Sequence, residues 1–130
     1  MKRALAVATT LALVLSAPAL ARSVLFEGAI TGAHARPAML WLSADGTLEA
    51  SHMRWRSWGG AVAVGDGMIE WHGCTPNCGT DRAHEAKGSA HLSQIHVCEG
   101  RAYYSKVSVY VEDRGHQRLL RGLGVNYAPC

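Results

Sequence analysis

Residues 101–113 alternate between apolar and polar side chains with a period of two over most of their length. One face of this segment would carry Tyr103, Val107, Val109 and Val111, and the other would carry Lys106, Ser108, Tyr110 and Glu112. A period of two is the pattern of a β-strand with one buried face. Because a single strand cannot bury that face alone, the segment predicts a sheet with several partner strands.

Turn signals divide the rest of the chain into short segments that read as further strands. The expected strands are Ser23–Ile30, Ala38–Ser43, Thr47–Trp55, Ala61–Val64, Met68–Trp71, Ser89–Val97, Arg101–Asp113 and His116–Val125. The expected turns are Asp45-Gly46, Gly65-Asp66-Gly67, Glu99-Gly100 and Asp113-Arg114-Gly115, with a break at Gly59-Gly60. Helix is expected for at most one or two turns over Thr80–Lys87, or for one turn over Gln117–Leu123 in place of the last strand. The sequence predicts an all-β fold, a small antiparallel sandwich or barrel of about seven strands.

The first 21 residues have the pattern of a secretory signal peptide. Lys2-Arg3 gives a basic start, residues 4–15 are apolar, and Ala19-Leu20-Ala21 has the small-x-small form of a cleavage site. We expect cleavage after Ala21 and a single domain over residues 22–130. The apolar run is too short to span a bilayer comfortably, so no stable membrane insertion is expected after cleavage. The protein is therefore expected to be secreted or periplasmic.

The charge of the mature chain argues against one class of partner. Cleavage removes Lys2 and Arg3 and no acidic residue, so the formal net charge of +3 falls by two. A nearly neutral domain without a run of basic residues is not expected to bind nucleic acid.

All four cysteines, Cys74, Cys78, Cys98 and Cys130, lie after the expected cleavage site. An even number of cysteines in an exported chain favours disulfides, and four cysteines allow three pairings. A zinc site made by Cys74 and Cys78 with His72 and His84 is a weaker alternative, because C-x3-C is not a usual zinc spacing and oxidation opposes free thiolates. The same spacing, in a chain without an α/β pattern, disfavours a redox centre.

The segment from Asp45 onward resembles an uncharacterised group of small secreted bacterial proteins, mainly actinobacterial, with a W-x-x-W-G-x-x-x-A-x-G-x-G pattern followed by C-x-P-x-C. The matching residues are Asp45-Gly46, Trp55, Trp58-Gly59, Ala63, Gly65, Gly67, Cys74, Pro76, Cys78, Cys98, Gly100, Tyr103 and Tyr104. Met53 replaces the group's usual leucine, and Gly79-Thr80 replaces its usual Ala-x-Gly. The resemblance implies a secreted β-rich domain, with tryptophans, glycines and cysteines as parts of its scaffold.

The resemblance also bears on the disulfides, because Cys74 and Cys78 occur as a unit in that group. We therefore prefer Cys74–Cys78 with Cys98–Cys130, while the two crossed pairings stay open. On the loop-entropy model, closing the loop from Cys98 to Cys130 would stabilise the fold by about 3.7 kcal/mol, and the Cys74–Cys78 loop by about 2 kcal/mol. The longer loop would also hold the C-terminal segment in place.

Seven histidines make metal binding an alternative function. The candidate copper or zinc ligands in that case are His72, His84, His91 and His96. His91 and His96 are five apart, so on a regular strand they would face opposite sides. No pair of histidines has ligand spacing, and solvated surface histidines are the preferred interpretation.

The candidate binding surface consists of Arg54, Arg56, Trp58 and Asn77. Trp55 and Trp58 are three apart and would face opposite ways on a strand, so Trp58 is expected on the surface beside Arg54 and Arg56. The two arginines could pair with an acidic partner. Asn77 lies between Cys74 and Cys78, in a segment expected to form a turn, called the cysteine turn below.

No catalytic motif or paired nucleophile and base is present in the sequence, so we expect neither an enzyme nor a cofactor. The preferred function is a binding module for a protein or cell-envelope partner, of which an inhibitor of a secreted hydrolase is one form. The alternative is a histidine-dependent copper- or zinc-binding protein.

Overall fold

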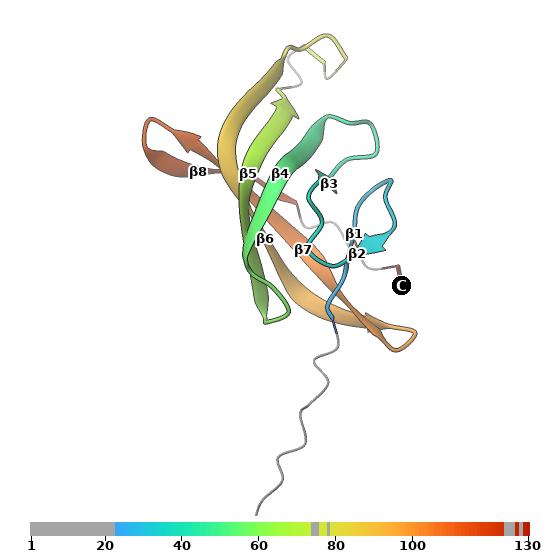
Figure 1. Ribbon diagram of the computed structural model, residues 1–130. Coiled ribbons are helices and arrows are strands. Elements are labelled where there is room, and N and C mark those ends of the chain that lie inside the picture. Colours follow the sequence, from blue (N-terminus) through green and yellow to red (C-terminus); the bar gives the residue numbers. More distant parts are fainter. Residues whose placement is uncertain (1–22, 74–75, 78, 124–126, 128) are drawn as a thin grey trace, which may run out of the picture.

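The computed structural model describes residues 23–73, 76–77, 79–123, 127 and 129–130, and in this part of the chain it is all-β (Figure 1). The strands are β1 (Phe26–Glu27), β2 (Ala33–His34), β3 (Leu40–Trp41), β4 (Leu48–Ser57), β5 (Val62–His72), β6 (Ala83–Cys98), β7 (Arg101–Asp113) and β8 (His116–Leu123). β1 and β2 form a small antiparallel sheet. The other six form a second antiparallel sheet in which every neighbour in space is also the neighbour in sequence.

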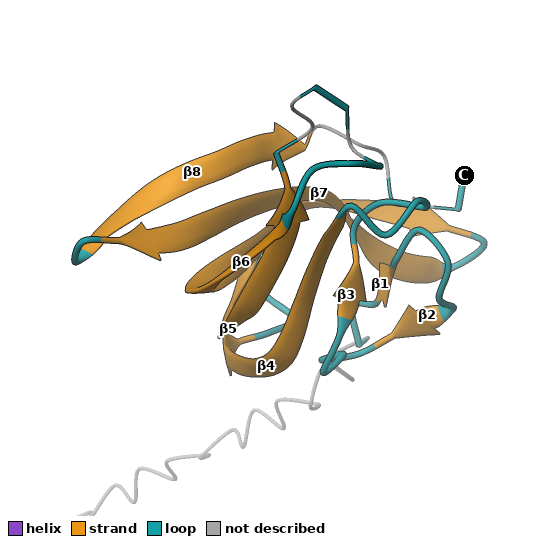
Figure 2. Ribbon diagram, turned by 90° about the horizontal axis from the view of Figure 1, so that it is seen from above, coloured by secondary structure: helices purple, strands orange, loops and turns teal. Residues whose placement is uncertain are grey.

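The predicted fold class, a small all-β antiparallel architecture, is confirmed, and its form is sandwich-like. The six-stranded sheet is open, with β3 and β8 as its edges. It is strongly curved, and both views show β1 and β2 beside β3 (Figures 1 and 2). Within the described residues, no helix has the length and apolar character needed to cross a bilayer.

The hydrophobic core lies between one face of the large sheet and the N-terminal segment. Alternate residues of the long strands supply one wall, because successive side chains of a strand point to opposite faces of the sheet. Residues near β1 and β3 supply the other wall. The buried cluster comprises Val24, Phe26, Leu40, Leu42, Leu48, Ala50, Met53, Ala63, Ile69, Ala90, Leu92, Tyr104, Val107, Val109, Val111 and Tyr127. In register, Ala63 lies opposite Leu92, which lies opposite Val107.

The segment around β1 connects β7 to β3, an edge strand of the large sheet. Leu25 forms a parallel bridge with Tyr103 of β7, and Ala29 donates its backbone N–H to the Trp41 carbonyl of β3 at 2.8 Å. The sequence predicted a strand over residues 23–30, but only Phe26–Glu27 form β1, because the segment leaves β7 to reach β3 within a few residues.

The expected turn at Gly65-Asp66-Gly67 is wrong, because all three residues lie inside β5. These glycines mark a close approach between strands instead. A Cβ on Gly65 would lie 2.8 Å from the Trp55 ring, and one on Gly67 would lie 2.5 Å from the Ser51 carbonyl oxygen. Glycine inside a strand often has this meaning.

The expected helix over Thr80–Lys87 is also wrong, since Ala83–Lys87 form the first part of β6. Their backbone pairs with β5 in unbroken register, from Met68 opposite Lys87 to His72 opposite Ala83. A segment this short gains little from helical hydrogen bonds, and pairing with an eleven-residue strand satisfies its backbone instead. The helical alternative for Gln117–Leu123 fails for the same reason, because these residues form β8.

The predicted Cys98–Cys130 disulfide is confirmed, with a Cα–Cα distance of 5.8 Å. It joins the end of β6 to the C-terminal segment. Cys74 and Cys78 lie outside the described residues, and so does their preferred pairing. Disulfides are typical of proteins in non-reducing compartments, and this bond therefore favours such a location.

Candidate functional site

An open groove of about 780 Å³ crosses the face of the large sheet that points away from the core. Every strand from β4 to β8 contributes to it. The lining residues are His52, Arg54, Trp55, Arg56, Asp66, Gly67, Met68, Lys87, Gly88, Glu112 and Gln117. Two residues of the predicted binding surface, Arg54 and Arg56, are therefore in the groove.

Strand register brings the charged residues of the groove together. Lys87 of β6 lies opposite Met68 of β5, and Glu112 of β7 lies opposite Gln117 of β8. A register shift in β4 lies between Ser51 and Arg54, where His52 has a φ of 54°, and after it the backbone of Arg54 lies opposite that of Asp66. A bulge of this kind changes which face the next residues occupy.

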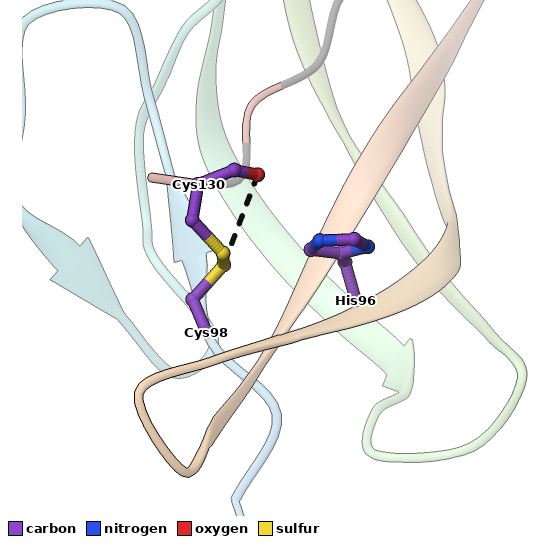
Figure 3. Close-up of side chains that lie close together, drawn as sticks. All are labelled: His96, Cys98 and Cys130. Atoms are coloured by element: carbon purple, nitrogen blue, oxygen red, sulfur yellow. Dashed lines mark hydrogen bonds between the residues drawn. A yellow bond between two sulfur atoms is a disulfide. The ribbon is translucent and has the colours of Figure 1, made fainter.

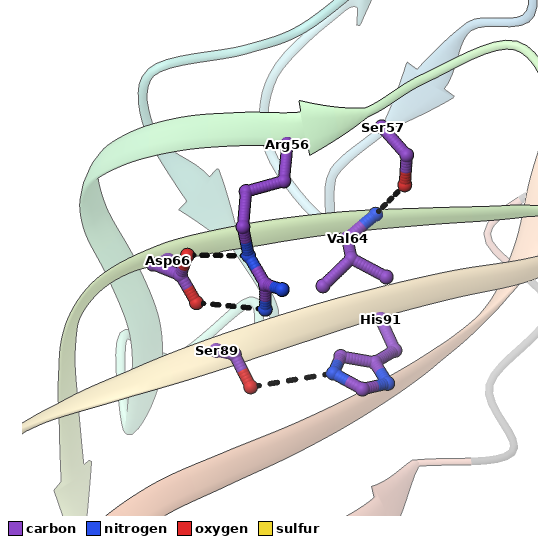
Figure 4. Close-up of polar contacts among 6 residues, drawn as sticks. All are labelled: Arg56, Ser57, Val64, Asp66, Ser89 and His91. Carbon is purple, nitrogen blue, oxygen red and sulfur yellow. Dashed lines mark hydrogen bonds and ion pairs between the residues drawn. The ribbon is translucent and has the colours of Figure 1, made fainter.

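The groove has more unpaired positive charge than negative charge. Arg56 forms a two-point ion pair with Asp66, at 2.6 Å from Nε and 3.1 Å from the terminal nitrogen (Figure 4). Neither Arg54 nor Lys87 has an ion-pair partner among the described residues. Glu112 is the remaining acidic side chain of the lining. Arg54 and Lys87 are both exposed, so an acidic group entering the groove could contact them.

Ser89 and His91 lie beside the Arg56–Asp66 pair. Ser89 Oγ is 3.3 Å from His91 Nε2, and the His91 ring contacts the Tyr110 ring at 4.7 Å between centroids. Partial burial lowers the pKa of His91, the Arg56 guanidinium lowers it further, and the Asp66 carboxylate opposes both effects. Ser89 is 0 % exposed, so this serine and histidine do not present an accessible nucleophile.

The expectation that Trp55 and Trp58 face opposite ways is wrong. Their ring centroids are 4.5 Å apart, because β4 ends at Ser57 and the alternation of a strand does not extend to Trp58. Trp58 is half-buried beside the core, where its indole N–H donates to the Val24 carbonyl at 2.8 Å and its ring meets Tyr104 edge-on. Trp58 therefore acts as packing and does not line the groove.

Asn77 is exposed in the connection between β5 and β6, as its place in the cysteine turn predicted. Its side-chain oxygen accepts the Thr80 N–H at 3.1 Å, and its carbonyl accepts the Asp81 N–H at 3.1 Å. These bonds make Asn77 the organiser of a turn, and it is not among the residues that line the groove.

The structure places the four candidate histidine ligands at separate points. Trp71 lies opposite His84, and the two rings stack. His72 is the next residue along β5, so His72 and His84 project from opposite faces of the sheet. His91 lies beside the groove and His96 near the end of β6. In the described part of the chain, the one group of three close metal ligands contains His96 and no second histidine.

The sequence did not predict the other residues of the groove, which are His52, Trp55, Asp66, Gly67, Met68, Lys87, Gly88, Glu112 and Gln117. The sequence predicts that Glu112 lies on the polar face of its strand, but it does not predict which residues of other strands lie near it. Lys87 lies in the segment that was expected to be helical, so it was not expected on a strand. Only the β6–β7 register, which places Gly88 opposite Val111, brings Lys87 and Glu112 to adjacent positions.

No family model, curated protein or solved structure matches the chain. The function is therefore inferred from the geometry of the groove.

Proposed function

We propose that this protein is an exported, non-enzymatic binding module whose groove across β4–β8 takes an acidic group of a protein or cell-envelope partner. The groove itself carries the proposal. It is open, it spans five strands, and it holds two exposed cations, Arg54 and Lys87, without ion-pair partners among the described residues. A carboxylate or phosphate of a partner would complete charge pairs that the folded chain leaves unmade.

The rest of the groove lining suits a macromolecular partner. Met68 and Trp55 are among the lining residues and offer apolar contact beside the charges, and binding surfaces commonly combine aromatic residues, methionine and arginine. The Arg56–Asp66 pair is exposed and contributes only about 0.2–1 kcal/mol to stability. It therefore holds the Arg56 side chain in place without being essential to the fold.

Export is supported by the signal-peptide pattern of residues 1–21 and by the Cys98–Cys130 disulfide. The resemblance of residues 45–111 to small secreted bacterial proteins supports the same proposal. A partner would then be met in the periplasm, in the envelope or outside the cell.

The proposal is tested by using the folded domain as bait in culture fluid and in detergent extracts of the native envelope. We expect the unmodified protein to retain a saturable partner, with affinity that falls as ionic strength rises. Arg54→Glu reverses one of the unpaired charges and should abolish retention of that partner. The matched control is Arg101→Glu, which changes an exposed arginine at the far end of β7.

Equal loss of the partner in both variants would show a general charge effect and would refute a role for the groove. Retention by Arg54→Glu at unchanged affinity would refute it as well. If neither extract contains a saturable partner for the unmodified protein, the binding-module proposal itself fails.

A further inference from the structure

Three side chains with metal-ligand chemistry lie close together away from the groove: His96, Cys98 and Cys130 (Figure 3). Their nearest possible ligand atoms all lie within 4.8 Å of one another. His96 and Cys130 are exposed and Cys98 is buried, so one side of the group faces solvent. In the oxidised protein, the two sulfur atoms are bonded to each other.

The end of β6 fixes the first two members of this group. His96 and Cys98 are two residues apart on one strand, so their side chains project from the same face. Cys98 lies opposite Arg101 across a two-residue turn. That turn holds Glu99 at a φ of 49° and Gly100 at 78°, the left-handed conformations of a tight hairpin.

A buried tyrosine holds the third member near the other two. Tyr127 packs its ring against Phe26 at 5.2 Å, donates its hydroxyl to the Leu42 carbonyl at 2.6 Å, and donates its backbone N–H to the Ser105 carbonyl at 3.3 Å. None of these contacts involves the disulfide. Tyr127 therefore anchors the chain three residues before Cys130 through contacts that do not depend on the sulfur–sulfur bond.

We propose that the reduced protein binds one divalent ion of the zinc class through an imidazole nitrogen of His96 and the thiolates of Cys98 and Cys130, and that the disulfide blocks this site. One nitrogen and two sulfurs form a donor set that zinc prefers, and three protein ligands leave the fourth position to water on the exposed side. Ligand atoms on one tetrahedral zinc lie roughly 3.5 Å apart, given Zn–S bonds of about 2.3 Å and Zn–N bonds of about 2.0 Å. The possible ligand atoms of the three residues already lie within 4.8 Å of one another, and the two sulfurs, which are bonded in the oxidised protein, move apart after reduction to take this spacing.

The change of state needs a thiol reductant, for which a small dithiol serves. The dithiol gives up two electrons and the protons of its two thiols and becomes a cyclic disulfide, while the Cys98–Cys130 bond breaks and each protein sulfur takes one electron and one proton. Metal binding then releases these two protons, because thiolates are the ligands, and neutral His96 donates a lone pair. The site is thus open to metal only when the protein is reduced.

The test uses the full chain with Cys74→Ser and Cys78→Ser, so that no other cysteine can bind metal. After anaerobic reduction and removal of the dithiol, the protein is titrated with Co²⁺ and then with Zn²⁺. We expect one Co²⁺ per chain, with the near-ultraviolet absorption of thiolate–cobalt bonds, displaced by one Zn²⁺. The oxidised protein should show none of this absorption.

Two histidine variants separate a three-ligand site from a pair of thiols. His96→Ala should weaken zinc binding by more than about tenfold, since loss of even a supporting contact to a ligand costs that much. His116→Ala, a control at an exposed histidine at the start of β8, should leave the affinity unchanged. Equal affinity in His96→Ala and the parent would overturn the proposal.

Near-ultraviolet circular dichroism of the reduced protein covers the case in which reduction loosens the fold. A native spectrum without zinc, or one that zinc restores, supports the site when it accompanies the cobalt signal. A reduced protein that zinc leaves unfolded, or that binds cobalt without thiolate absorption, contradicts it.

Discussion

Tyr104 and Tyr127 are two core tyrosines whose hydroxyl groups have different surroundings. The Tyr104 hydroxyl accepts the Gly59 N–H at 2.9 Å and donates to the Gly60 carbonyl at 2.8 Å, and both glycines are exposed. The Tyr127 hydroxyl donates at 2.6 Å to the carbonyl of Leu42, a buried residue. Burial raises the pKa of both phenols, so each stays neutral and able to donate at physiological pH.

Removing one oxygen at a time should therefore have unequal effects. Tyr127→Phe leaves a buried carbonyl without its donor and should lower the free energy of unfolding by about 1–3 kcal/mol. Tyr104→Phe should cost only about 0.5–1.5 kcal/mol, because water can replace the hydroxyl at the exposed glycines. Urea unfolding of the two variants beside the parent measures both values. A larger loss for Tyr104→Phe would contradict this account of the two sites.

His91 should make stability depend on pH. Its pKa in the folded protein is lowered from the ordinary 6.5, first by burial and then by Arg56. The unfolded chain therefore binds a proton before the folded one does, and this contribution is present above pH 6.5 and is lost as the pH falls through the folded pKa. His91→Gln should flatten this part of the profile of urea midpoint against pH. His116→Gln, at an exposed position, is the control, and an unchanged profile in His91→Gln would refute the assignment.

At the scale of the elements, the alternation of apolar and polar residues predicted the strands better than glycine predicted the turns. Residues 101–113 form β7 at the predicted bounds, because their period of two reports burial directly. Gly65 and Gly67 suggested a turn, but in the structure they lie within β5, where the side chains of Trp55 and Met53 leave no room for a Cβ. This close packing follows from the register between β4 and β5, which cannot be read from a short stretch of sequence.

Gly88 should be the least replaceable of the described glycines in the large sheet. A Cβ at this position would collide with the backbone carbonyl oxygen of Tyr110 in β7 and would lie 2.6 Å from Ile69 in β5. Gly88→Ala should therefore push neighbouring strands apart and lower the free energy of unfolding by about 1–3 kcal/mol or more. Gly60→Ala, which meets no atom within 4 Å, should leave the urea midpoint nearly unchanged. Similar midpoints for the two variants would show that β6 and β7 can separate without cost.

At the scale of the whole molecule, the groove was predictable only in part. Arg54 and Arg56 alternate along one strand, so the sequence alone places both on the polar face. Lys87, Asp66 and Glu112 come from three other strands, and they join the arginines only through the register of β4–β7. Register depends on pairing between distant segments, and this is the information that a single sequence supplies least.

The Cys98–Cys130 disulfide closes a much longer loop than the predicted Cys74–Cys78 disulfide would, so it should account for most of the effect of reduction on stability. Replacing both residues with serine removes the constraint on about 33 residues of unfolded chain and should lower the free energy of unfolding by about 3.7 kcal/mol. On the predicted Cys74–Cys78 pairing, Cys74→Ser with Cys78→Ser would open a loop of only about five residues and should cost about 2 kcal/mol.

Urea unfolding without reductant compares these two double variants with the parent. Alkylation before and after reduction counts the free thiols by intact mass. We expect none before reduction and four after it in the parent, and two after it in each double variant. The Cys98 and Cys130 variant loses the longer covalent loop, so its midpoint should be the lower of the two. A higher midpoint for that variant would contradict the dependence of stability on the length of the closed loop.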